Sequence, residues 1–130
     1  MIISAQGLKQ VLQSNVVELS FIRRHEKYGW PAGRRMLCTL DRNLLLSLPG
    51  RMTLNFKVPS HPPAYPADAY NLVCVFDLFW QDFRMVPAET ANVITVIPSH
   101  TKKQQDEFWK YFSATLQYMS TQDKTKFMKT

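Results

Sequence analysis

The sequence predicts a mainly β protein with flanking helices (α+β), built as a small antiparallel barrel of the SH3-like or Sm-like kind with a C-terminal helix. Short apolar stretches alternate with polar residues at the two-residue period of half-buried strands. The breaks between them are too short for crossover helices. The length of 130 residues and the hydrophobic content of 45% suit one packed domain. We therefore expect a barrel core at about 16–97 within a single domain, 1–130.

The first half of the chain predicts one short helix and two strands. Ser4 is a favourable N-cap, and Asp41 is placed to cap a second, shorter helical segment. Gly and Pro residues mark the turn between the strands. In chain order we expect a helix over 5–13 that Asn15 ends, a strand over 16–22, a hairpin tip over 24–33, a strand over 34–40, and a helical turn over 41–46 stopped by Pro49-Gly50.

A proline-rich insertion is expected at about 49–70, because five of the eight prolines fall between Pro49 and Pro66. The alternation over 52–58 predicts an extra strand, and 60–68 is expected to be an extended loop. The segment 61–66 (His-Pro-Pro-Ala-Tyr-Pro) has two interpretations: a polyproline-type ligand for another protein, or a stiff insertion across the barrel mouth.

The second half predicts three short strands within 71–97, with Asp77 and Asp82 on either side of a turn. A helix is expected over about 101–121, and its apolar stripe predicts packing on the domain more than binding to a partner. A frayed basic tail is expected at 122–130. The helical stripe comprises Phe108, Trp109, Phe112, Leu116 and Met119. The predicted barrel core includes Val17, Leu19, Phe21, Leu37 or Cys38, Val73, Val75 and Phe83.

The net charge of +6 is unevenly distributed along the chain. Lys and Arg outnumber Asp and Glu by seven to three in residues 1–50 and by six to three in residues 99–130, whereas residues 51–98 carry three against four. This asymmetry indicates a polyanionic partner such as nucleic acid. The alternative is that the charge only maintains solubility.

The sequence also indicates a cytoplasmic protein. No apolar run approaches the ~20 residues of a membrane helix, and the first residues lack the basic start and apolar centre of a secretion signal. Cys38 and Cys74 each lie in an apolar strand pattern and are expected to be reduced. A disulfide between neighbouring strands is the alternative.

Residue patterns of catalysis and cofactor binding are missing from the sequence, so we expect no enzymatic activity, no metal and no cofactor. His25, His61 and His100 fall in three separate predicted loops. The two cysteines do not form a metal-ligand pair, and the four glycines form no phosphate-binding loop.

The hairpin between the first two strands is the candidate functional site. Its guanidinium and ammonium groups are suited to phosphates, and its aromatic faces to unpaired bases. In the alternative, the aromatic residues fold back on the domain and the arginines are merely solvated. The predicted nucleic-acid-binding residues are Arg23, Arg24, Lys27, Tyr28, Trp30, Arg34 and Arg35.

The strand residues resemble a family of small bacteriophage proteins with an Sm-like, SH3-type barrel, related distantly to WYL domains. The resemblance covers about residues 8–97. It rests on Val16-Val-x-Leu-x-Phe before the basic hairpin, on Arg35-Met-Leu-Cys-Thr-Leu after it, and on Val75-Phe-Asp, Trp80-x-x-Phe83-Arg84 and Val93-Ile94. The proline-rich insertion and the helix after Pro98 lie outside the shared pattern. The resemblance implies the barrel fold and a phage origin.

Together these features predict a non-enzymatic, regulatory phage protein that binds RNA or single-stranded DNA in the host cytoplasm. The alternative is an adaptor that binds host machinery such as RNA polymerase and modulates or inhibits it, because exposed aromatic residues with Arg also anchor protein interfaces. The sequence does not fix an oligomeric state.

Overall fold

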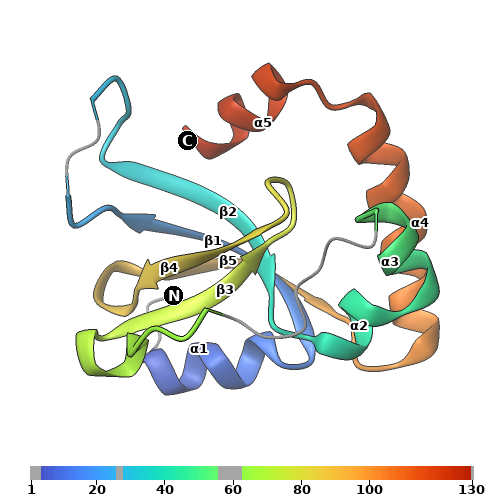
Figure 1. The fold of residues 1–130 in the computed structure, drawn as a ribbon, viewed down its shortest axis with the longest axis horizontal. Coiled ribbons are helices and arrows are strands. Elements are labelled where there is room, and N and C mark those ends of the chain that lie inside the picture. Colours follow the sequence, from blue (N-terminus) through green and yellow to red (C-terminus); the bar gives the residue numbers. More distant parts are fainter. Residues whose placement is uncertain (1–3, 26–27, 56–62, 130) are drawn as a thin grey trace.

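In a computed structural model that describes residues 4–25, 28–55 and 63–129, five antiparallel strands form one sheet in the order β4-β3-β2-β1-β5. Helices lie on both sides of this sheet (Figure 1). The α+β class and the antiparallel pairing are thus confirmed. The elements are α1 (Ala5–Leu12), β1 (Asn15–Ile22), β2 (Gly33–Thr39), α2 (Arg42–Leu46), α3 (Leu48–Thr53), the 3-10 helix η1 (Ala67–Tyr70), β3 (Leu72–Asp77), β4 (Asp82–Pro87), the 3-10 helix η2 (Ala88–Thr90), β5 (Asn92–Pro98), α4 (Lys102–Tyr118) and α5 (Thr121–Met128).

Strict alternation along β1 and β2 directs one set of side chains into a core that α1 covers. β1 pairs with β2 on one side and with β5 on the other. Ser4 caps α1 by accepting from the Gly7 N–H at 3.1 Å, and the Asn15 amide donates to the Val11 carbonyl at 2.8 Å where the helix ends. The core on this face contains Leu8, Leu12, Val17, Leu19, Phe21, Met36, Cys38, Val73, Val75 and Val86.

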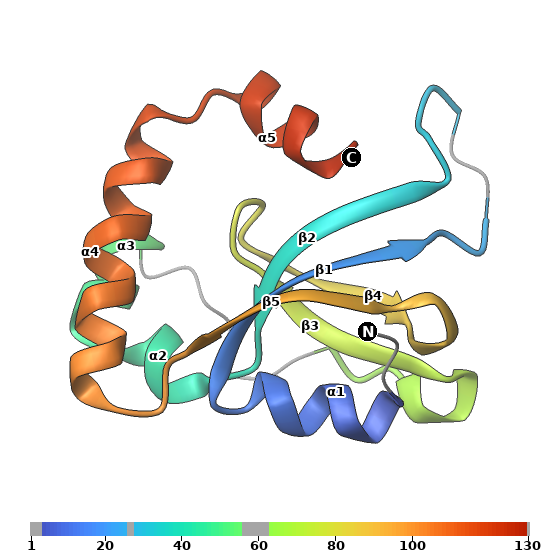
Figure 2. The same ribbon diagram turned by 180° about the vertical axis from the view of Figure 1, so that it is seen from behind.

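The expected closed barrel is not formed. β4 and β5 are the two edges of the sheet, and the structure shows no pairing between them within the described residues. β2 and β3 pair only at Cys38 with Asp77 and at Thr39 with Phe76. Beyond these positions the β1–β2 hairpin rises away from the β3–β4 hairpin (Figure 2). Closure would bring the charged side chains of Arg34 and Arg84 into a sealed interior, where unpaired charge is costly.

The opposite face of the sheet packs against α2, α3 and α4 in a second core. Trp109 is buried in α4, and its indole N–H donates to the Leu44 carbonyl at 3.0 Å. The expected packing of the C-terminal helix on the sheet is confirmed. Leu37 and Phe83 belong to this side, so placing Phe83 in the first core was wrong. This core contains Val16, Leu44, Leu45, Leu54, Phe76, Leu78, Phe79, Phe108, Trp109 and Phe112, with Leu37, Phe83, Leu116 and Met119 at its margin.

The strand expected over 52–58 is wrong where the structure describes it, because Met52 and Thr53 belong to α3. Pro49 does not stop a helix but starts one, since proline is favoured in the first turn. Ser47 caps α3 by accepting from the Gly50 N–H at 3.3 Å. The rest of the expected strand, from 56 onward, lies outside the described residues, as does the first part of the proline-rich loop.

The C-terminal tail was expected to fray but forms α5. Ser120 and Asp123 make a capping box at its start. Phe127 packs edge-on against Phe79 with ring centroids 4.8 Å apart, and Met128 is buried. α5 therefore lies against the sheet near the β1–β2 hairpin (Figures 1 and 2). Within the described parts of the chain, no helix has the length and apolar character needed to cross a membrane.

Both cysteines are free thiols, as expected. Cys38 is fully buried on β2, and burial raises the pKa of its thiol far above the ordinary value. Cys74 is half-buried on β3, and burial raises its pKa as well.

Candidate nucleic-acid interface

The β1–β2 hairpin extends beyond the sheet, and backbone hydrogen bonds continue into its tip. The Arg23 N–H donates to the Ala32 carbonyl at 2.9 Å. Gly29 has φ +79°, a left-handed conformation that a glycine adopts without strain. Tyr28 beside it is fully exposed, at 103% of its reference area. Lys27, one of the predicted site residues, lies outside the described residues.

Arg23 stiffens the hairpin. Its guanidinium donates to the Pro31 carbonyl at 2.7 Å and lies 5.8 Å from the centre of the Trp30 ring. Burial lowers its pKa. Its side chain also lines the cleft and the hollow described below.

Arg24 connects the hairpin to the two 3-10 helices. It makes a two-pronged ion pair with Glu89, at 2.6 and 2.8 Å, and donates to the Tyr70 carbonyl at 2.8 Å. The hydrogen bond to Glu89 raises the pKa of Arg24 and lowers that of Glu89. Arg24 therefore holds η1 and η2 against the hairpin, and most of its donors are already engaged.

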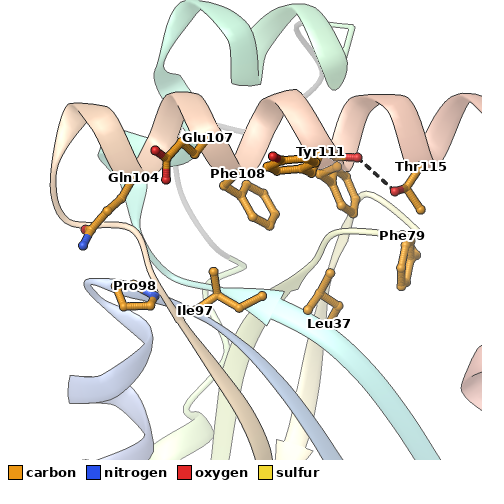
Figure 3. Close-up of a pocket in the computed structure, with 10 residues that line it drawn as sticks. Leu37, Phe79, Ile97, Pro98, Gln104, Glu107, Phe108, Tyr111 and Thr115 are labelled. Atoms are coloured by element: carbon orange, nitrogen blue, oxygen red, sulfur yellow. Dashed lines mark hydrogen bonds between the residues drawn. The ribbon is translucent and has the colours of Figure 1, made fainter.

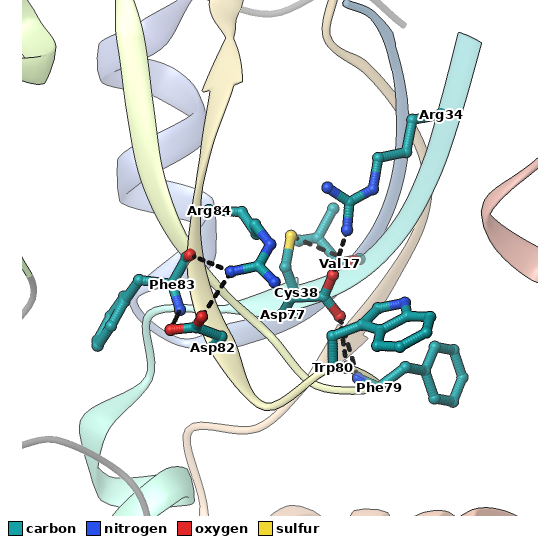
Figure 4. A network of polar contacts seen from close by, with 9 residues as sticks. All are labelled: Val17, Arg34, Cys38, Asp77, Phe79, Trp80, Asp82, Phe83 and Arg84. Carbon is teal, nitrogen blue, oxygen red and sulfur yellow. Dashed lines mark hydrogen bonds and ion pairs between the residues drawn. The ribbon is translucent and has the colours of Figure 1, made fainter. Parts of the chain in front are cut away.

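Arg34 is buried, in contrast to its expected place on the hairpin surface. It follows the alternation of Met36 and Cys38 into the concave side of the sheet and is 8% exposed. Its Nη2 donates to Asp77 Oδ2 at 2.6 Å. The other oxygen of Asp77 accepts from the Phe79 and Trp80 N–H groups at 3.1 and 3.2 Å. Figure 4 shows this network, in which Arg34 donates to Asp77 while Arg84 donates to Asp82 and to the Phe83 carbonyl.

Burial dominates the titration of this pair. It raises the pKa of Asp77, against opposing contributions from the Trp80 N–H and from the charges of Arg34 and Arg84. Burial also lowers the pKa of Arg34, and the neighbouring charges of Arg23 and Arg84 lower it further. In both residues burial, which disfavours the charged form, sets the direction of the pKa shift.

Arg35 and Trp30 lie toward α5, so the structure separates them from Arg34. Arg35 faces the side of the sheet on which α5 lies. It is 3.5 Å from Glu18, and its guanidinium is 4.0 Å from the centre of the Phe127 ring. Lys129 of α5 lies 5.0 Å from the centre of the Trp30 ring. The six predicted residues that the structure describes therefore do not form one continuous surface.

A cleft of about 740 Å³ opens between the β1–β2 hairpin and the β3–β4 side of the sheet. The rings of Tyr65 and Tyr70 lie at its rim, half-exposed, with centroids 5.8 Å apart and planes tilted by 30°. A second hollow of about 580 Å³, lined by Tyr28 and Trp30, shares Arg23, Arg24 and His25 with it. The cleft is lined by Phe21, Arg23, Arg24, His25, Arg34, Tyr65, Tyr70, Leu72, Met85 and Pro87.

Tyr65, Tyr70 and His25 line the cleft but are not among the residues predicted from the sequence. The two tyrosines lie in the expected proline-rich insertion. One of the two interpretations of its segment 61–66 was a stiff insertion across the barrel mouth, which was the available signal for Tyr65. The arrangement offers cations, exposed aromatic faces and one imidazole beside the apolar side chains of Phe21, Leu72 and Met85. Such a surface can bind an anionic, partly aromatic ligand without any covalent chemistry.

A separate, apolar groove of about 570 Å³ lies on the other side of the sheet, between α4 and strands β2 and β5 (Figure 3). Leu37 and Ile97 lie opposite Phe108 of α4, and Phe112 also lines the groove. Tyr111 at its margin is 70% exposed. The groove resembles a site for apolar side chains rather than for phosphates.

In the part of the chain that the structure describes, no three His, Cys, Asp or Glu side chains are grouped to hold a metal ion. Comparison of the chain with known protein families, with curated protein sequences and with solved structures finds no match.

Proposed function

We propose that the protein is a non-enzymatic, regulatory nucleic-acid-binding protein that holds single-stranded RNA or DNA in the cleft beside the β1–β2 hairpin. The observation that carries the proposal is the cleft itself, in which Arg23, Arg34 and the paired rings of Tyr65 and Tyr70 face one space. Cations that track a backbone and aromatic faces that stack on bases are the two components of sequence-tolerant single-strand binding.

A single strand is preferred to a duplex because the rings of Tyr65 and Tyr70 stack only on bases whose faces are free. The exposed Tyr28 at the hairpin tip extends the same surface to the neighbouring hollow. We include in the proposal a relation to the Sm-like, SH3-type phage barrels and a location in the host cytoplasm. The strand order β4-β3-β2-β1-β5 supports that relation, since the last strand returns beside the first.

The test is fluorescence anisotropy with a labelled single-stranded RNA, the matching DNA and their duplex at increasing salt. Single strands should bind more tightly than the duplex, and log K should fall with log salt by about 0.7 for each phosphate neutralised. No binding of any oligonucleotide at low salt would remove this function.

The apolar groove favours a second candidate function, an adaptor that binds host machinery such as RNA polymerase. The occupant of the groove would be an extended apolar segment of the partner. Glu107 lines the groove and has no ion pair among the described residues, so a basic residue of the segment would lie beside it. The open edge of β5, with Ile94 and Val96 half-exposed, offers main-chain pairing beside the groove. A pull-down from bacterial lysate, with and without nuclease, distinguishes the two functions. The adaptor predicts a protein partner that survives nuclease and is lost on Tyr111→Ala.

A further inference from the structure

The floor of the cleft carries more positive than negative charge. Arg34 donates to Asp77 (Figure 4), and the charges of Arg84 and Arg23 are close enough to affect Arg34. Arg84 is also paired with Asp82 at the surface, at 2.7 Å. Asp77 is therefore the only acid among the described residues that faces Arg34, and Arg23 has no acidic partner there.

The donors of Arg34 are incompletely used. Nη2 is bonded to Asp77, but Nε is buried and has no hydrogen-bond partner among the described residues. An unpaired buried donor on a charged group is unfavourable, and an arriving acceptor would relieve it. Arg34 lines the cleft, so a small shift of its side chain would let an acceptor in the cleft reach this donor.

Both oxygens of Asp77 are already occupied. Oδ2 accepts from Arg34, and Oδ1 accepts from two backbone N–H groups in the turn after β3. The carboxylate is thus fixed by the turn and cannot follow Arg34 to satisfy its remaining donors. An anion in the cleft would supply the hydrogen-bond acceptor that Nε of Arg34 lacks among the described residues.

We propose that the cleft floor between Arg34 and Arg23 is a phosphate subsite, and that it takes the phosphate group of a nucleotide whose base lies toward Tyr65 and Tyr70. This inference rests on the proposed function and identifies the part of the cleft that receives a phosphate. A planar guanidinium offers parallel donors to phosphate oxygens and is better suited to this task than an ammonium group. The shared ligand chemistry is a phosphate oxygen, whether from a strand, a free nucleotide or inorganic phosphate.

Two substitutions with opposite expected effects test the subsite. Arg34→Lys keeps the charge beside Asp77 but removes the guanidinium, and should weaken binding of a labelled single strand about tenfold or more. Asp77→Asn removes the competing negative charge while its side-chain oxygen can still accept from the turn, and should strengthen binding severalfold. Arg51→Ala, which removes one exposed charge from α3, is the matched control and should change affinity little.

Phosphate alone provides a second measurement. The melting temperature of the wild-type protein should rise with inorganic phosphate more than with chloride of the same ionic strength, because a ligand that binds only the folded state stabilises it. Arg34→Lys should lose this difference. Adenosine monophosphate in place of phosphate shows whether a free nucleotide suffices or a strand is required.

The results separate the subsite from the function. If the strand binds but both variants bind it as the wild type does, the subsite is wrong and the function stands. If phosphate stabilises the wild type while no strand binds, the function is wrong and the subsite stands. If both variants lose affinity alike, the pair is only structural, and the subsite is overturned. The subsite is also overturned if inorganic phosphate raises the melting temperature of the wild-type protein no more than chloride does.

Discussion

Arg34 Nη2 lies 2.6 Å from Asp77 Oδ2, where the backbone pairing between β2 and β3 ends. This ion pair spans 43 residues of sequence and joins the two halves of the sheet at the base of the cleft. It places two charged side chains beside the apolar core on this face of the sheet. The pair thus links β2 to β3 at the point where the two hairpins diverge and the cleft begins.

Arg34→Leu should lower the free energy of unfolding by about 3–5 kcal/mol, because it leaves the Asp77 carboxylate buried without its partner. In Arg34→Leu/Asp77→Asn the uncompensated charge is gone and an acceptor remains for the turn, so more than half of the loss should return. Urea denaturation measures both. Equal destabilisation of the single and double variants would show that the buried charge is not the cause.

The pH dependence of stability should carry a specific contribution from Asp77. Burial raises its pKa above the ordinary value of 3.8, so the folded state holds the proton more tightly than the unfolded state. The contribution is therefore fully present below pH 3.8 and is lost as the pH rises through the raised folded pKa. Relative to Asp77→Asn, the wild type should lose stability over this window and then level off.

Other acids change in the opposite sense but are common to both proteins in this comparison. Arg24 holds the pKa of Glu89 below its ordinary value, and Arg84 does the same for Asp82. Their stabilisation is present above the unfolded pKa and is lost as the pH falls through the folded pKa. Denaturation at closely spaced pH values, from about 3 to 7, measures the difference; a constant difference would contradict the raised pKa of Asp77.

Gly50→Ala should destabilise the contact between α3 and α4 by about 1–3 kcal/mol through overpacking. A Cβ at this position would lie 2.6 Å from the Leu44 carbonyl oxygen and 2.9 Å from the Trp109 ring. Gly33→Ala is the control, because its nearest neighbour is 4.0 Å away, at Ile22. Thermal or urea unfolding of the two variants should separate them, and equal stability would mean that the contact yields without strain.

Tyr70→Ala should weaken single-strand binding by about 1–3 kcal/mol if the ring stacks on a base. Tyr118→Ala, on a side chain of α4 that is 81% exposed, is the aromatic control. Trp30→Ala tests the original hairpin hypothesis, and we expect a smaller effect on binding because Lys129 lies over that ring. Anisotropy titrations compare the three, and a larger loss for Trp30→Ala than for Tyr70→Ala would place the site at the hairpin tip.

The strands could be predicted because a two-residue alternation of apolar and polar residues indicates which face of a strand is buried. Val17, Leu19 and Phe21 are an example. Whether the sheet closes into a barrel could not be predicted. Closure depends on pairing between β4 and β5, and the alternation within each strand carries no information about that pairing. α5 was not predicted because its segment has only two large apolar residues, Phe127 and Met128, and these lie among lysines. Pro49 was interpreted as a stop although the same residue is favoured in the first turn of a helix.

The residue types around the candidate site could be predicted from the sequence, but their arrangement could not. The partners of its arginines lie far along the chain, with Glu89 65 residues from Arg24 and Asp77 43 residues from Arg34. A local cluster of basic residues in the sequence shows neither pairing. Alternation alone could have shown that Arg34 shares a face with Met36 and Cys38, whereas Arg35 faces the other way.

The most direct test of the account is amide chemical-shift mapping by NMR as a short single-stranded oligonucleotide is titrated into the labelled protein. We predict that the largest shifts fall around the cleft, at Arg23, His25, Tyr70, Leu72 and Met85, and that added salt reverses them. Shifts confined to Ile97, Tyr111 and Thr115 along the apolar groove, or no shifts at low salt, would contradict it.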